Sequence, residues 1–166
     1  PRAEPQRAGV QHHLRLANAV IPDFSRSTIR IIAGQEHDWF TDAAKQILAS
    51  ADFELTGMSN RMGYRFNGTA LQRNNSQELL SSAVIPGTIQ VSPDGQLLIL
   101  MADAQTTGGY PRIGQVISID IPLLAQKSAG SKIRFALVSM QEAEALYLKR
   151  ESQLMNLKKD FALLFA

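Results

Sequence analysis

Residues 103–114, with the sequence DAQTTGGYPRIG, carry more chemical groups than a simple turn requires. The segment holds a carboxylate, an amide, two hydroxyls, two adjacent glycines, a phenol and a guanidinium, and it directly follows the apolar run LLILMA. A loop that only reverses direction needs a few turn residues, as in the PDG sequence at 93–95. Adjacent glycines also let the backbone approach a ligand closely. The segment therefore predicts a binding site, with a glycine-rich β-turn as the alternative.

Two other segments supply groups that complement this loop. In RMGYR, Arg61 and Arg65 offer guanidiniums that can hold a carboxylate or carbonate through paired hydrogen bonds, and Tyr64 adds a directional hydroxyl. An exposed turn with ordinary ion pairs is the alternative for this segment. In PGTIQV, Gln90 lies among apolar residues, where its amide needs partners if it is buried. The alternative for Gln90 is an outward-facing position on a strand.

The motifs of several common enzyme classes are absent from the sequence. The three histidines, His12, His13 and His37, have no acidic or histidine partner at metal-ligand spacing, so we predict no metal site. A G-x-x-x-x-G spacing is followed by Gln115 and Val116, where a phosphate-binding loop needs lysine and then serine or threonine. No G-x-S-x-G motif indicates a hydrolytic triad. Metal, P-loop and serine-hydrolase chemistry are therefore not predicted for this chain.

Composition narrows the class of protein further. The chain has 166 residues, 45% of them apolar, which suits one domain with a substantial core. Lysine and arginine number 17 against 15 acidic residues, without a long run of one charge, so neither nucleic acid nor a membrane surface is an expected partner. The absence of cysteine favours a reducing compartment, and we expect a cytoplasmic protein. No apolar segment is long enough to cross a bilayer.

The chain is expected to be mainly β with minor α structure. About eight short strands, few of them separated by long helices, favour a closed or sandwich-like β architecture over a parallel, doubly wound sheet. The clearest signal is a hairpin over 88–102 around the PDG turn. The other main strand predictions fall in 27–34, 52–60, 62–68, 113–121 and 132–140.

Two helices and a connector complete the predicted organisation. Residues 36–50 predict one short helix with acidic residues in its first turn, and 122–126 predict a helical turn. Residues 141–166 predict an amphipathic helix whose apolar stripe we expect to pack on the barrel, with packing on a partner as the alternative. Residues 1–27 hold three prolines and predict a connector, with LRLANAV as a short strand, leaving 28–166 as the domain.

The blocks NRMGYRFNG, PGTIQV, DAQTTGGYPRIG and KIRFALVSMQEA, in this order, resemble the biotin-dependent carboxyltransferase family. This family includes the C subunit of 5-oxoprolinase, KipA and allophanate hydrolase subunit 2. The resemblance runs from about Ile29 to Ala145. Full members are about twice as long, so the chain resembles their C-terminal half, and the abrupt start at Pro1 favours a piece of a longer protein.

The resemblance implies a cyclophilin-like closed β-barrel that works beside a second barrel protein, of the KipI type or of the type of the 5-oxoprolinase B subunit. In a 5-oxoprolinase, a third subunit joins them and ATP drives the opening of 5-oxoproline to glutamate. In a urea carboxylase, fused relatives pass the carboxyl group of carboxybiotin to urea. Both substrates are small amides. The expected cofactors are therefore ATP in the complex, or carboxybiotin in the second reaction, with no motif for either in this chain.

The resemblance also implies which residues form the site. The catalytic set is Asp103, which would orient or deprotonate an amide N–H, with Arg65 and Tyr64. Arg61 or Arg65 would bind a carboxylate or a developing oxyanion. The substrate-binding set is Arg61, Gln90, Gln105, Thr106, Thr107, Gly108, Gly109 and Tyr110.

Two classes of function remain open on the sequence. The first is a non-autonomous subunit of an ATP-dependent 5-oxoprolinase or a related amidolyase, with a site shared between two barrels. The second is a KipA-type regulatory protein that binds a KipI-type inhibitor of a histidine kinase. The carboxyltransferase part of a urea carboxylase is a further alternative within the enzyme class.

Overall fold

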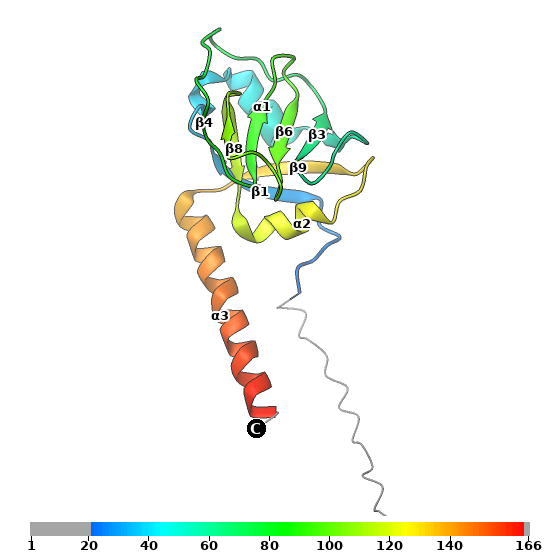
Figure 1. Ribbon diagram of the computed structural model, residues 1–166, viewed down its shortest axis with the longest axis vertical. Helices are drawn as coiled ribbons and strands as arrows, with labels where there is room; N and C mark the ends of the chain where they lie inside the picture. The colour runs from blue at the N-terminus through cyan, green and yellow to red at the C-terminus, as the bar shows by residue number, and fades with distance from the viewer. Residues whose placement is uncertain (1–20, 165–166) are drawn as a thin grey trace, which may run out of the picture.

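The computed structural model describes residues 21–164, which form a β-barrel with short helices and one long C-terminal helix (Figure 1). This confirms the predicted mainly β class and the closed barrel. The predicted strand in LRLANAV lies outside the described residues. In chain order the elements are β1 (Thr28–Ala33), η1 (His37–Trp39), α1 (Asp42–Ser50), β2 (Phe53–Leu55), β3 (Gly63–Asn67), β4 (Ser82–Ala83), β5 (Thr88–Val91), β6 (Leu97–Leu100), β7 (Thr107–Gly108), β8 (Arg112–Val116), η2 (Ser118–Asp120), α2 (Ile121–Ala125), β9 (Lys132–Leu137) and α3 (Met140–Leu164).

Seven strands close the barrel in the order β1-β8-β5-β6-β3-β2-β9, with β9 returning to β1. The β1–β9 pair is parallel, with Ile29 opposite Phe135, and the other pairs are antiparallel. The predicted hairpin is present as β5 and β6, joined through a turn in which Gly95 has φ of 81°. Closure pairs the backbone of every barrel strand on both sides, so the barrel has no free edge.

The barrel interior is filled by large apolar side chains. Alternate residues of β9 are buried, as expected when one face of a strand lies on the core. The rings of Phe53 and Phe135 have centroids 5.5 Å apart in a tilted arrangement, and Phe66 meets Phe135 edge-on at 6.4 Å. Such packing stabilises the pairing of β2, β3 and β9.

The helix predicted over 36–50 is divided into two parts. A 3₁₀ turn, η1, ends before Phe40, and α1 begins only at Asp42. Thr41 is the reason for the break, because its extended backbone and its side chain, which accepts a hydrogen bond from the Ala44 N–H at 3.1 Å, form a helix N-cap. The buried residues Ala44 and Leu48 hold α1 against the barrel.

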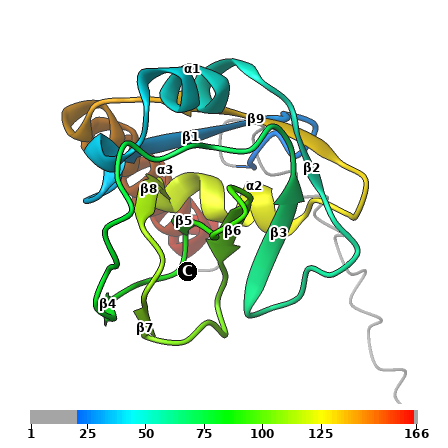
Figure 2. The ribbon, with the colours of Figure 1, turned by 90° about the horizontal axis from the view of Figure 1, so that it is seen from above.

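A separate two-stranded sheet, which we call the β4–β7 arm (residues 82–83 and 107–108), lies beside the barrel. Ser82 pairs with Gly108 and Ala83 with Thr107. The Val84 N–H extends the pairing by donating to the Thr106 carbonyl at 3.0 Å. Figure 2 shows the arm outside the barrel wall, with β7 lying within the connection from β6 to β8. Two residues are too few to show a strand periodicity, so no local pattern predicts the arm.

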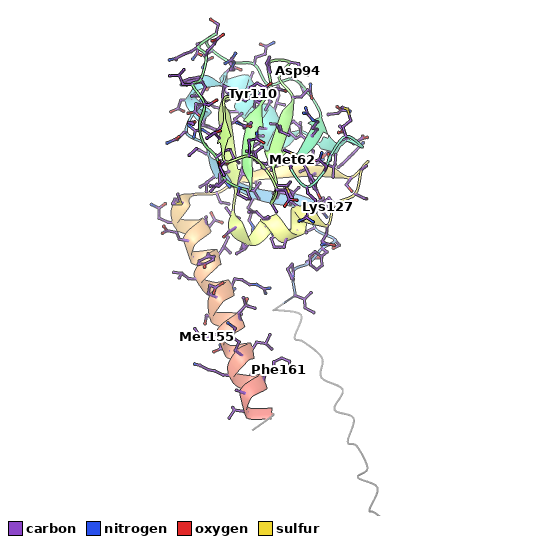
Figure 3. All side chains as sticks on the ribbon, in the orientation of Figure 1. Met62, Asp94, Tyr110, Lys127, Met155 and Phe161 are labelled. Atoms are coloured by element: carbon purple, nitrogen blue, oxygen red, sulfur yellow. The ribbon has the colours of Figure 1, made fainter. Side chains whose placement is uncertain are left out.

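The C-terminal helix is present, but the expectation that it packs along the barrel is wrong. Helix α3 makes its largest contact with η2, and the rest extends away from the barrel (Figure 1). Tyr147, Leu148 and Met155 are exposed along it. Figure 3 shows Met155 and Phe161 well away from the strands. None of the helices within residues 21–164 combines the length and the apolar character that a membrane span requires.

Candidate functional site

Arg61 and Asp103 form an ion pair where β3 begins and β6 ends. The Arg61 Nε lies 2.8 Å from one Asp103 carboxylate oxygen, and a second guanidinium nitrogen donates to the other oxygen at 3.2 Å. The backbone fixes this meeting, because the Asp103 N–H donates to the Arg61 carbonyl at 3.0 Å. The side chains are 82% and 49% exposed, respectively. A charged pair is thus fixed at its base but open to a ligand or a partner.

Gln90 and Gly108 form a second, buried cluster. Gln90 is 1% exposed, which excludes the alternative of an outward-facing strand residue. Its amide nitrogen donates to the Tyr110 carbonyl at 3.2 Å and so holds the loop after β7 onto β5. A Cβ on Gly108 would lie 2.5 Å from that nitrogen. A side chain at this position would therefore have to displace the buried Gln90 amide.

Ser82 adds a polar group to this cluster that the sequence did not identify. It lies directly opposite Gly108 in the β4–β7 arm, so its side chain is on the face of the arm toward which a Gly108 Cβ would point. Its hydroxyl is buried and has no hydrogen-bond partner among residues 21–164. A buried polar group of this kind is unusual and leaves hydrogen-bonding capacity beside the loop.

Glu36 and Arg112 anchor the end of the loop. Arg112 donates to both Glu36 carboxylate oxygens, at 2.6 and 2.5 Å, and donates through its backbone N–H at 3.1 Å. Burial disfavours the charged carboxylate, but the hydrogen bonds from Arg112 outweigh it and lower the pKa of Glu36 below its usual value. Arg112 also donates to the Ala83 carbonyl at 3.1 Å. It therefore ties the β4–β7 arm to the barrel, a role that sequence spacing does not reveal.

The structure does not bring Tyr64 or Arg65 into either cluster. Tyr64 packs against the core, and its hydroxyl donates to the Ala125 carbonyl in α2 at 3.3 Å. Arg65 is exposed and, as the next residue of β3, projects from the opposite face. Arg65 pairs with Leu98 near the start of β6, close to the 93–95 turn. The hydrogen bond from Ser92 lowers the pKa of Asp94, and the charge of Arg65 contributes in the same direction.

The remaining predicted residues line the exposed side of the loop. Gln105, Thr106 and Thr107 are exposed, and Tyr110 is 42% exposed. Figure 3 places Tyr110 and Asp94 toward the end of the barrel away from α3, and Met62 nearer to α2. The loop therefore runs along the barrel from the Arg61–Asp103 pair to Tyr110. In residues 21–164, no group of three or more histidine, cysteine or acidic side chains could hold a metal ion.

The amino-acid sequence of the chain matches a known family model. Residues 2–137 match the carboxyltransferase domain, subdomain A and B. The match includes the whole barrel and the loop at 103–111, and ends at the last residue of β9, before α3. The resemblance stated from the sequence is thereby confirmed.

Curated relatives and a solved structure agree with that match. The chain is 42% identical to the C subunit of 5-oxoprolinase from Haemophilus influenzae, over 89% of this chain and 48% of the relative. It is 44% identical to the protein of the same name from Escherichia coli K12, over 69% and 37%. The chain thus spans about half the length of these relatives or less. The urea amidolyase of K. lactis has the same fold, with a TM-score of 0.78 and 19% identity over 84% of this chain and 9% of that one.

Proposed function

This chain belongs to the family of the carboxyltransferase domain, subdomain A and B, and on that premise we propose that it is part of an ATP-dependent 5-oxoprolinase. The two relatives reported above are named as C subunits of 5-oxoprolinase. The segments in which they align with this chain cover 89% and 69% of it. The reaction would be the opening of 5-oxoproline to glutamate. The observation that supports the proposal best is the accessible Arg61–Asp103 ion pair at the start of the loop 103–110.

The chemistry of this pair suits amide hydrolysis. In the reaction, water adds to the ring carbonyl carbon, the C–N bond breaks, and the nitrogen leaves as an amine after gaining a proton. Asp103 would accept a hydrogen bond from the amide N–H or exchange a proton with it. Arg61 would stabilise negative charge that develops on oxygen, as a fixed cation beside the reacting group. Gln105 and the two threonines, Thr106 and Thr107, would hydrogen-bond the substrate.

The active site would be shared with another protein. Half of Asp103 and most of Arg61 are exposed, so this chain forms only one wall around them. A second cyclophilin-like protein, of the KipI type or of the type of the 5-oxoprolinase B subunit, would supply the opposite wall in the cytoplasm. ATP would act at the level of the complex, which a third subunit joins; this chain has no P-loop motif for it.

The test is release of glutamate from 5-oxoproline by the full-length subunit mixed with its two neighbouring gene products and ATP. We expect turnover that disappears when this subunit is omitted. An assembled complex without such turnover would reject the proposal. Carboxylation of urea, or binding to a KipI-type inhibitor without catalysis, would then identify the carboxyltransferase or the regulatory alternative.

The role of Asp103 has a matched control in this barrel. Asp52 pairs with Arg134 through a 2.5 Å contact, and the aspartate is about as exposed as Asp103, at 44% against 49%. Asp103→Asn should reduce the turnover of the complex at least about 100-fold, the usual effect of losing a general acid or base. Asp52→Asn should leave the turnover near that of the unchanged complex. Equal activity of the two variants would contradict a catalytic Asp103.

A further inference from the structure

A pocket of about 380 Å³ lies at the Tyr110 end of the loop, away from the Arg61–Asp103 pair. We call it the Arg73 pocket, and its walls are the segment 73–79 and the residues 109–111, with part of β5 and the turn after it. The segment 79–81 lies beside the residues 109–111, because a Cβ on Gly109 would be 3.5 Å from the Leu79 carbonyl oxygen and 3.5 Å from the Ser81 hydroxyl. The residues that define its chemistry are Arg73, Glu78, Leu79, Val91, Tyr110 and Pro111.

The backbone around Arg73 is fixed to the segment before α1. Arg73 forms an antiparallel bridge with Phe40. On either side of it, the Thr41 N–H donates to the Gln72 carbonyl at 3.1 Å, and the Asn74 N–H donates to the Trp39 carbonyl at 2.7 Å. The guanidinium is therefore attached to a rigid base, although its segment has no regular secondary structure.

The Arg73 guanidinium has donors to spare. One terminal nitrogen donates to the Gln77 carbonyl at 3.0 Å, which orients the group along the pocket wall. In the part of the chain that the structure describes, Arg73 has no acidic partner within salt-bridge distance, whereas Arg61, Arg112 and Arg134 each have one. A half-buried guanidinium has five N–H donors and cannot deprotonate, so an anion is the partner it fits.

The rest of the pocket limits the size and shape of that anion. Leu79, Val91 and Pro111 give apolar walls, and the exposed Tyr110 brings a phenol that can donate or accept a hydrogen bond. Glu78 adds a negative charge at the same pocket, which disfavours a ligand with several negative charges. The combination suits a compact molecule with one carboxylate and an apolar ring or chain.

We propose that the Arg73 pocket binds a small monocarboxylate, whose carboxylate pairs with Arg73 and whose apolar part lies against Leu79, Val91 and Pro111. The choice of 5-oxoproline as this ligand rests on the proposed function. A molecule bound there lies away from the Arg61–Asp103 pair, so the pocket would be a second binding site for 5-oxoproline, separate from the proposed catalytic one. Arg65 is a weaker candidate for such an anion site, because it is exposed on the outer face of β3.

Binding is tested by calorimetry on the assembled full-length complex without ATP, with 5-oxoproline and with 2-pyrrolidinone, the same ring without the carboxylate. Arg73→Gln should weaken binding of 5-oxoproline at least about tenfold, the effect of losing a charge-assisted hydrogen bond, and should not change the response to 2-pyrrolidinone. Glu78→Gln should tighten binding of 5-oxoproline. Arg134→Gln removes an arginine remote from the pocket and should have no effect.

The outcomes separate this inference from the proposed function. Binding that depends on Arg73 supports the pocket whether or not the complex releases glutamate. Failure of the unchanged complex to bind 5-oxoproline, or equal binding after Arg73→Gln, would overturn it even in a complex that hydrolyses 5-oxoproline. An unchanged thermal unfolding midpoint for Arg73→Gln shows that the variant is folded. If that midpoint falls, Arg73→Lys, which keeps the charge, should retain more binding than Arg73→Gln; equal loss in both would count against the pocket.

Discussion

The backbone of Gly108 lies so close to the side chain of Gln90 that a single added carbon at Gly108 would be 2.5 Å from the Gln90 amide nitrogen. That nitrogen donates to the Tyr110 carbonyl, so the approach of β7 to β5 depends on the absence of a side chain at Gly108. The neighbouring Gly109 differs, because a Cβ there would meet atoms only at 3.5 Å, an ordinary contact. Two adjacent glycines of one motif therefore have different roles.

We predict that Gly108→Ala displaces the Gln90 amide and the loop, at a cost of about 1–3 kcal/mol in the free energy of unfolding. The turnover of the full-length complex should fall with it, since the loop carries the proposed substrate-binding groups. Gly109→Ala is the matched control and should stay within about 0.5 kcal/mol of the unchanged protein. Urea unfolding and glutamate release measure the two effects. Similar values for both variants would contradict the close approach at Gly108.

A second prediction concerns Gly34, at the end of β1. A Cβ there would lie 2.2 Å from the Arg112 carbonyl oxygen and 2.7 Å from the Gly114 nitrogen, both backbone atoms that cannot rotate away. Gly34→Ala should therefore destabilise the barrel by about 3 kcal/mol and disturb the Glu36–Arg112 pair nearby. At Gly57, a Cβ would meet nothing within 4 Å, so Gly57→Ala should be close to neutral. Comparing the two urea midpoints checks the register of β1 against β8.

A third prediction concerns Asp120, whose side chain is 1% exposed. Its carboxylate accepts hydrogen bonds from the Arg30 backbone at 2.8 Å, from the Arg30 guanidinium at 2.6 and 3.0 Å, and from Arg26 at 2.5 Å. Asp120→Asn keeps the shape but removes the charge that two arginines share, and should cost about 3 kcal/mol at pH 7. Asp38→Asn, at an aspartate with a 95% exposed side chain, should change stability little. A cost for Asp120→Asn no larger than that of the control would show that this network contributes little.

The same carboxylate predicts how stability depends on pH. Burial opposes ionisation of Asp120, but the hydrogen bonds from Arg30 outweigh it, so its folded pKa lies below the usual 3.8. A lowered pKa means that the charged carboxylate stabilises the fold fully above 3.8, and that this contribution is lost as the pH falls through the folded value. The stability difference between the unchanged protein and Asp120→Asn should therefore be constant from about pH 7 to about 5 and shrink below about 4. A difference that stays constant down to about pH 2 would contradict the lowered pKa.

Several barrel strands could be predicted from the sequence because their signals are local, although the strand predicted over 113–121 ends at Val116 and a 3₁₀ turn follows it. The PDG turn between two apolar runs predicts the β5–β6 hairpin, and the apolar alternation of β9 predicts its buried face, whichever element covers it. The glycines and polar groups of 103–110 also stand out without any knowledge of the fold. The burial of Gln90 was not decided by the sequence, which also allowed an outward-facing strand position, and only the structure excludes that alternative.

Residue pairs distant in the chain were decided only by the tertiary structure. The Glu36–Arg112, Asp120–Arg30 and Arg61–Asp103 pairs join positions that only closure of the barrel brings together. The position of the two-residue β4–β7 arm, and of α3 beyond the barrel, also depends on packing rather than on periodicity. The sequence by itself therefore determined which residues can do chemistry and which strands they follow. The barrel decided which of them meet, because contacts between distant residues depend on strand register and closure, which no local pattern contains.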